Sequence, residues 1–185
     1  MNRVFNPFRY IAGGKALAIG VVCIVASSLM LYSGGMIQDS FLHIGYADAS
    51  IVKVFAVQCL WWLAPAMLLY LSGLAITKSK IRIIDILGTT AFAQIILLMI
   101  IAPMLLPAVQ DSTTVLLSSL QSGTEPATKA MISMIAYGIW TTFALILYYI
   151  WNYNAFAVSC NVKGTKAILL FILVQVVLTI VSNIL

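Results

Sequence analysis

Five long apolar stretches, separated by short polar segments, constrain this chain more than any other feature of its sequence. A helix needs about 20 mostly apolar residues to cross the roughly 30 Å hydrocarbon core of a bilayer. The stretches are continuously apolar and too long for barrel strands, which alternate over about 10 residues. We therefore predict an all-α bundle of five transmembrane helices, with spans at about 16–34, 52–76, 83–106, 130–151 and 166–185.

The low content of charged residues excludes most soluble classes of protein. Only 8% of the residues are charged and 63% are hydrophobic, whereas soluble domains carry about a quarter charged residues. This chain has too little polar surface to face water as a soluble enzyme, a secreted disulfide scaffold, a disordered tail or a nucleic-acid-binding protein. We predict one transmembrane domain over residues 16–185, preceded by an interfacial segment over residues 1–15.

The N-terminal segment mixes aromatic and basic side chains and is too short to cross a bilayer. Phe5, Phe8 and Tyr10 lie among Arg3 and Arg9. Such a segment is typical of the headgroup region, with the rings turned toward the lipid chains and the guanidinium groups toward water. A cleaved signal peptide is the alternative. However, the apolar run that follows exceeds the roughly 7–15 residues of a signal core, and no clear A-x-A cleavage site follows it.

Basic residues divide unequally between the two sides of a five-span bundle. With a cytoplasmic N-terminus, eight Lys and Arg residues lie on the cytoplasmic side and two on the other side. Every loop then agrees with the positive-inside rule, so we predict a C-terminus outside the cytoplasm. We expect the cytoplasmic basic residues to face anionic lipid headgroups, with docking of a cytoplasmic partner as the alternative. They include Arg3, Arg9, Lys78, Lys80 and Arg82.

A stripe of small residues follows one face of the first predicted span: Ala16, Gly20, Ser27 and Gly34. Lipid tails are as apolar as leucine, so transmembrane helices associate through close packing and interhelical hydrogen bonds. We therefore predict a close helix contact along this stripe, inside the subunit or between subunits.

Three prolines fall within or at the end of the predicted spans: Pro65, Pro103 and Pro107. Proline has no backbone N–H and disrupts the helical hydrogen-bond ladder. We expect these prolines to kink or loosen the second and third spans, with a distorted outer end of the third span.

Three amide side chains lie deep in the predicted spans: Gln58, Gln94 and Gln175. Uncharged amides hydrogen-bond between helices in membranes, and this is the use that we expect. The alternative is a polar cavity for a solute, lined by these three amides together with Tyr137 and Thr141 of the fourth span. Kinked helices near the bilayer midplane are typical of transport sites, although the chain has no internal duplication.

Motifs for catalysis, cofactors and metal binding are missing from the sequence. There is no H-E-x-x-H, no G-x-S-x-G, no phosphate-binding glycine loop and no carboxylate pair at depth. His43 has too few potential metal ligands near it in the sequence, and the three cysteines show no C-x-x-C spacing. Cys160, near the membrane face, is a candidate for acylation. We expect no enzyme activity, no catalytic residue, no metal and no cofactor.

The segment from Phe5 to Gly14 reads FNPFRYIAGG and leads into the first span. With five spans and a cytoplasmic N-terminus, it resembles the Yip family of Ypt/Rab-interacting-protein-like membrane proteins, particularly the short bacterial members. The resemblance covers essentially the whole chain, but the longer cytoplasmic N-terminal region of the eukaryotic members is missing. It implies a non-enzymatic protein that organises the membrane or binds partner proteins, and it transfers no functional residue to this chain.

We therefore expect a scaffold that contacts lipids and binds another copy of itself or another membrane protein, without a nucleic-acid partner. A bacterial cytoplasmic (inner) membrane fits the short loops and the lack of Asn-x-Ser/Thr sequons. A small-solute transporter or channel subunit is the alternative. An intramembrane enzyme is the third hypothesis, for which no acid–base or nucleophile–base set is visible.

The predicted topology can be measured with reporter fusions. A reporter that is active only in the cytoplasm should work when fused before Met1 and fail when fused after Leu185, because an odd number of spans separates the two ends. Activity of both fusions in the same compartment would contradict the five-span topology.

Overall fold

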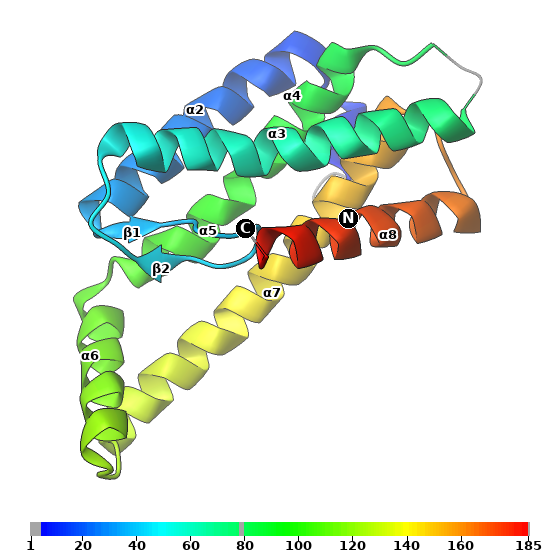
Figure 1. Ribbon diagram of the computed structural model, residues 1–185. Helices are drawn as coiled ribbons and strands as arrows, with labels where there is room; N and C mark the ends of the chain where they lie inside the picture. Colours follow the sequence, from blue (N-terminus) through cyan, green and yellow to red (C-terminus); the bar gives the residue numbers. More distant parts are fainter. Residues whose placement is uncertain (1–4, 78–79, 185) are drawn as a thin grey trace.

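The computed structural model describes residues 5–77 and 80–184 of the chain (Figure 1). Within these residues, five helical segments are long and apolar enough to cross a membrane, as the sequence predicts. Arg3, Lys78 and the last residue of the fifth predicted span lie outside the described residues. The five segments are α2 (Gly13–Ser33), α3 (Ile51–Ile76), α4 with α5 (Ile83–Ala93 and Ile95–Met104), α7 (Thr128–Ser159) and α8 (Thr165–Ser182).

Helix α2 packs against α4 with almost no side chain between the two backbones. A Cβ atom added to Gly20 would collide with the backbone of Ala91, and one added to Gly88 would collide with the carbonyl oxygen of Gly13. Glycine at both positions lets the helices approach closely, which strengthens van der Waals packing where lipid gives no hydrophobic driving force. The closest helix contact of the third span is therefore with the first.

The predicted small-residue stripe lies largely on this contact face. Ala16 and Ser27 are fully buried, and Gly20 is buried too. Gly34, at the end of α2, is half-buried, and a Cβ there would collide with the side chain of Met36. The stripe thus packs inside the subunit, and α4 covers the part of it around Gly20.

The third span is interrupted at Gln94, where the sequence offers no proline. The Gln94 N–H donates to the Ala91 carbonyl three residues back, and the Leu97 N–H donates to the Gln94 carbonyl in the same way. Such tight turns inside a helix mark a local break in the regular ladder. Helix α3 contains Pro65 and is continuous through it, and the kink or loosening expected there stays a prediction. The expected distortion near Pro103 is present, since α5 ends at Met104.

Two loops, between α2 and α3 and between α5 and α7, contain secondary structure that the sequence did not predict. A short hairpin pairs β1 (Met36–Ile37) with β2 (Gly45–Tyr46). Residues 107–122 form α6 (Pro107–Ser122). Its start and end carry recognisable signals, a proline at the first helical position and Gly123 in the left-handed conformation just beyond the last. A short 3-10 turn, η1 (Pro7–Arg9), precedes the first span.

Helix α7 is longer than its predicted span of 130–151. Its 32 residues extend over about 48 Å, which exceeds the hydrocarbon thickness, so the helix must tilt or project beyond the bilayer. In Figure 1, α7 runs obliquely to α3 and α8, and its first half has α6 beside it. Only 11% of its most apolar 18-residue window is buried, so most side chains of that window are exposed on the surface of the bundle.

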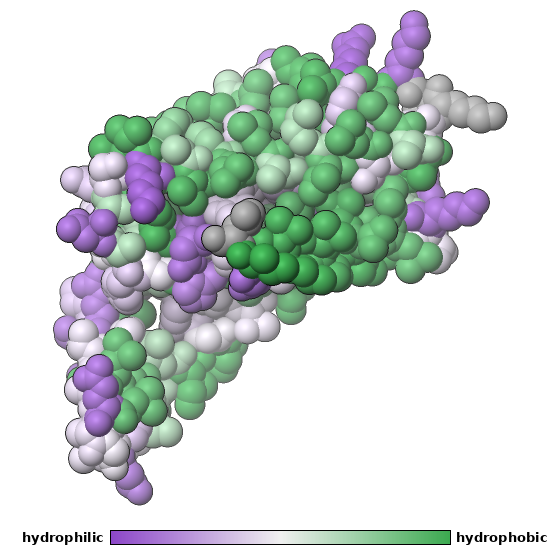
Figure 2. All heavy atoms as spheres, in the orientation of Figure 1, coloured by the Kyte–Doolittle hydropathy of each residue, from purple (hydrophilic) through white to green (hydrophobic). Residues whose placement is uncertain are grey.

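Hydrophobic side chains cover most of the visible surface along α3 and α8 (Figure 2). A surface of this kind is stable against hydrocarbon and unstable against water. Together with the five apolar segments, it indicates an integral membrane protein.

The close contact of α2 with α4 predicts that bulk at Gly20 is costly. We expect Gly20→Leu to destabilise the protein by about 1–3 kcal/mol, because overpacking forces the two backbones apart. The measurement is the unfolding midpoint in mixed detergent micelles.

The matched control is Gly138→Leu, a helical glycine of α7 whose added Cβ meets no other atom within 4 Å. It shares the change in helix propensity and lacks the collision. Equal midpoints for the two variants would show that the α2–α4 contact tolerates a large side chain.

Candidate functional site

The five polar residues predicted to line a cavity lie on four different segments. Gln58 is buried in α3, Gln94 is buried at the break between α4 and α5, and Gln175 is buried in α8. Tyr137 and Thr141 are half-buried in the first half of α7. Gln94 contacts Tyr148, and Tyr137 contacts the Ile100 carbonyl. A polar cavity shared by all five residues stays a prediction.

Gln94 joins the third span to the fourth through a small polar cluster. Its side chain interacts with the buried Tyr148 of α7, and the Asn152 amide donates to the Tyr148 carbonyl at 2.9 Å. A second link joins Thr89 of α4 to Ser159 of α7, whose hydroxyl oxygens are 2.9 Å apart. The Gln94–Tyr148 and Thr89–Ser159 contacts agree with the expected use of polar groups as interhelical hydrogen bonds, whereas the Asn152 bond lies within α7.

The proline in α5 also creates an interhelical hydrogen bond. Pro103 has no N–H, so the carbonyl of Met99, four residues before it, lacks its usual helical donor. The indole N–H of Trp140 on α7 donates to this carbonyl at 2.7 Å. Close by, the Tyr137 hydroxyl donates to the Ile100 carbonyl at 3.4 Å. Trp140 therefore links α7 to α5 through the carbonyl that Pro103 leaves free. The sequence alone did not predict this link.

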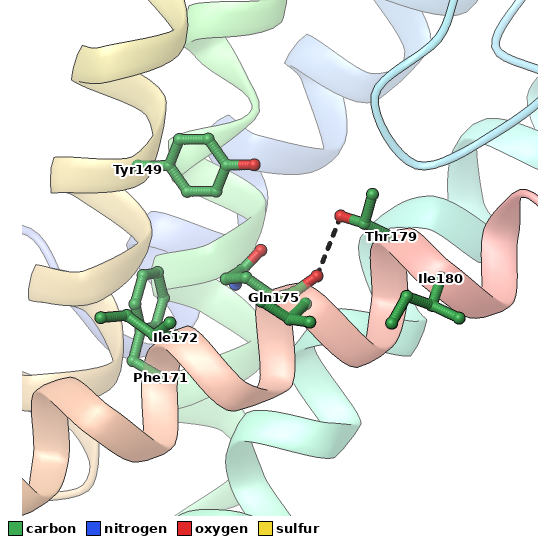
Figure 3. Close-up of a pocket in the computed structure, with 7 residues that line it drawn as sticks. Tyr149, Phe171, Ile172, Gln175, Thr179 and Ile180 are labelled. Carbon is green, nitrogen blue, oxygen red and sulfur yellow. Dashed lines mark hydrogen bonds between the residues drawn. The ribbon is translucent and has the colours of Figure 1, made fainter.

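A groove lies between α7 and α8, and its walls are almost entirely apolar. The groove is open to the surface, has a volume of about 460 Å³, and is lined by Tyr149, Phe171, Ile172, Gln175, Val176, Thr179 and Ile180. Figure 3 shows Gln175 projecting from α8 toward α7, with Tyr149 on the opposite wall. The two helices also meet where Tyr153 packs edge-on against Phe171, with ring centres 5.6 Å apart.

Gln175 is the unsatisfied polar group of this groove. Its side chain is 93% buried, being 7% exposed, and its Oε1 atom has no hydrogen-bond partner among the described residues. The neighbouring Thr179 hydroxyl donates to the Gln175 backbone carbonyl at 2.9 Å and does not reach the amide oxygen. A buried acceptor without a donor costs about 1–3 kcal/mol. The groove can therefore bind a group that brings a hydrogen-bond donor against an apolar surface.

No cluster of three or more potential metal ligands occurs within residues 5–77 and 80–184. His43 and Asp39 form a pair in the hairpin loop, with 2.6 Å between Nδ1 and the carboxylate oxygen. Both side chains are at least half exposed, so the pair contributes little to stability. The expected absence of a metal, a cofactor and catalytic residues stays a prediction.

The predicted interfacial segment is attached to the bundle through Phe8. Its side chain is fully buried and packs edge-on against Phe92 and Trp151, while Phe5 and Tyr10 are exposed. Phe8 thus packs inside the protein, whereas the sequence predicted that its ring would turn toward the lipid chains. Of the predicted basic residues, Arg9, Lys80 and Arg82 are exposed.

Cys160, the candidate for acylation, is fully buried just after the end of α7. Its sulfur lies against Gly73 of α3, so closely that a Cβ on that glycine would meet it. Burial raises the pKa of the Cys160 thiol to about 12, which keeps it protonated and unreactive. The expectation that Cys160 is acylated is therefore wrong for this fold. The side chain is buried away from an acylating enzyme, and its thiol stays protonated instead of forming the reactive thiolate.

Comparison with models of known protein families, with curated proteins and with solved structures finds no match to this chain.

Burial of Cys160 predicts slow alkylation. In a variant that retains it as the single cysteine, we expect a water-soluble maleimide to label the folded protein at least tenfold more slowly than the same protein unfolded in SDS, because the thiol is both enclosed and protonated. The control replaces Cys160 by Ala and carries Lys163→Cys at an exposed position three residues away. Equal labelling rates at the two positions in the folded state would contradict the burial of Cys160.

Proposed function

We propose that this protein is a non-enzymatic scaffold that holds a transmembrane helix of a partner protein in the α7–α8 groove. It resembles the Yip family in its five spans and its FNPFRYIAGG segment. We place it in a bacterial cytoplasmic membrane, with the N-terminus in the cytoplasm and the C-terminus outside, on the division of Lys and Arg between the loops.

The unpartnered Oε1 atom of Gln175 carries the proposal. A polar group at depth in a membrane protein marks a functional surface, because hydrocarbon offers it no hydrogen bond. The surrounding wall is apolar, with Ile172, Val176 and Ile180 on α8 facing Tyr149 on α7. A partner helix with a hydroxyl, amide or indole donor would satisfy the amide oxygen and cover these side chains.

The surroundings of Gln175 favour binding over catalysis. The groove lining includes no carboxylate, histidine or cysteine, and the Thr179 hydroxyl is engaged by a backbone carbonyl. Nucleophilic or acid–base catalysis needs two such groups within hydrogen-bond distance.

A solute pathway is the second candidate, and it rests on Gln58. This amide is 1% exposed, and its Oε1 atom also lacks a partner among the described residues. Two unsatisfied amides in one membrane domain are compatible with a polar path as well as with a protein interface.

Photo-crosslinking tests the groove as the partner site. A photoreactive amino acid at Val176 should capture a protein of one defined mass in cells, because Val176 lines the groove. Adding Gln175→Leu should lower the yield of that adduct about three- to tenfold, the loss expected for one hydrogen bond between transmembrane helices.

Val177 is the matched control position. It is exposed to nearly the same extent as Val176 (42% and 48%) but does not line the groove. The same adduct from both positions would contradict a specific groove. Solute flux into proteoliposomes that Gln58→Leu abolishes would favour the transport alternative over the scaffold.

A further inference from the structure

A second cavity lies at the end of the bundle where the chain enters α2 and where α7 connects to α8. It has a volume of about 410 Å³ and is lined by polar and apolar groups in nearly equal measure. Its polar lining consists largely of two cations and three amides, namely Arg9, Lys163, Asn6, Asn154 and Asn161. None of these residues belongs to the α7–α8 groove.

The N-terminal segment is fixed against α7, which gives the cavity a defined wall. Phe8 is buried between Phe92 and Trp151, with ring centres 6.0 and 5.8 Å away. The Asn154 amide donates to the Phe5 carbonyl at 2.9 Å, and the Asn6 amide donates to Asn154 Oδ1 at 3.3 Å. Arg9 is the last residue of the turn η1 that contains Phe8, so the packing of Phe8 also positions Arg9 at the cavity.

The two cations of the cavity, Arg9 and Lys163, form no ion pair with an acidic group in the described part of the chain. Helix α8 begins beside Lys163, with no side chain capping its N-terminus and no acidic residue in its first turn. A free helix N-terminus adds partial positive charge and backbone N–H donors to the two cations.

One residue that lines the cavity, Asn6, also has an acceptor without a donor in the described part of the chain. The Oδ1 atom of Asn6 is buried and has no hydrogen-bond partner among the described residues. A bare anion would satisfy Arg9 and Lys163 and would leave this oxygen unpaired. The complementary ligand therefore carries an anionic group and, next to it, a hydroxyl or ammonium donor.

We propose that this cavity binds the phosphate of a glycerophospholipid headgroup, with an adjacent hydroxyl or ammonium group donating to Asn6. The position along the chain fits a lipid, because Arg9 lies four residues before α2 and Lys163 two residues before α8, at the end of two spans. Phosphate pairs with Arg and Lys through charge-assisted hydrogen bonds. A soluble phosphate ester has the same chemistry and is the other source to be distinguished. This proposal does not depend on the function proposed for the α7–α8 groove.

Native mass spectrometry of the purified, delipidated protein tests the site, with phosphatidylglycerol as the probe. The wild-type chain should retain one phosphatidylglycerol, and it should retain phosphatidylcholine less well because choline has no hydrogen-bond donor. Arg9→Gln and Lys163→Gln should each weaken retention about fivefold, the effect of one basic residue at a headgroup. Lys163→Arg should keep it.

Lys166→Gln is the matched control, since Lys166 is an exposed cation on the first turn of α8 that does not line the cavity. Equal loss with Lys166→Gln, or unchanged retention with both Arg9→Gln and Lys163→Gln, would overturn the proposal. Competition by millimolar glycerol 3-phosphate that depends on Arg9 and Lys163 would support the phosphate site and assign it to a soluble ester. Retention without such competition assigns it to the lipid.

Discussion

The close approach of α2 to α4 is the constraint on which the rest of the bundle depends. Gly20 lies on the backbone of Ala91, and Gly88 lies on that of Gly13, so the first and third spans form one closely packed pair. In hydrocarbon, such packing replaces the hydrophobic effect as the source of helix association. Phe8, which precedes α2, extends this packing by contacting Phe92 of α4. Helix α7 packs against the third span of the pair.

Hydrogen bonds attach α7 to this pair, and one of them uses a backbone carbonyl that Pro103 leaves free. Trp140 donates to the carbonyl that Pro103 deprives of its donor, and Gln94 at the helix break interacts with Tyr148. Because water is absent from the bilayer core, each freed group must find such a partner. The exceptions are informative. Four buried oxygens, on Asn6, Gln58, Thr141 and Gln175, have no partner among the described residues. Of these residues, Gln175 lines the α7–α8 groove and Asn6 lines the second cavity.

Much of the fold follows from the sequence because span length depends on bilayer thickness and not on tertiary contacts. The five spans and the polarity of their connections are visible in the composition of each segment. The stripe containing Ala16 and Gly20 predicts close packing, but its partner could not be predicted, since small residues on one helix do not specify which helix approaches. The break at Gln94 was missed for a related reason: it arises where a polar residue turns toward Tyr148, whereas sequence rules expect breaks at proline.

The sequence by itself determined that this chain is apolar over five spans, how its charges divide between the loops, and which few polar residues lie at depth. Tertiary structure decided which of those residues meet. Asn154 reaches Phe5 across 149 positions of sequence, and Arg9 and Lys163 line one cavity although one precedes the first span and the other precedes the last. Periodicity reports the environment of a residue along its own helix, whereas a site made by several helices depends on crossing geometry, which the packing of glycine, proline and aromatic side chains sets.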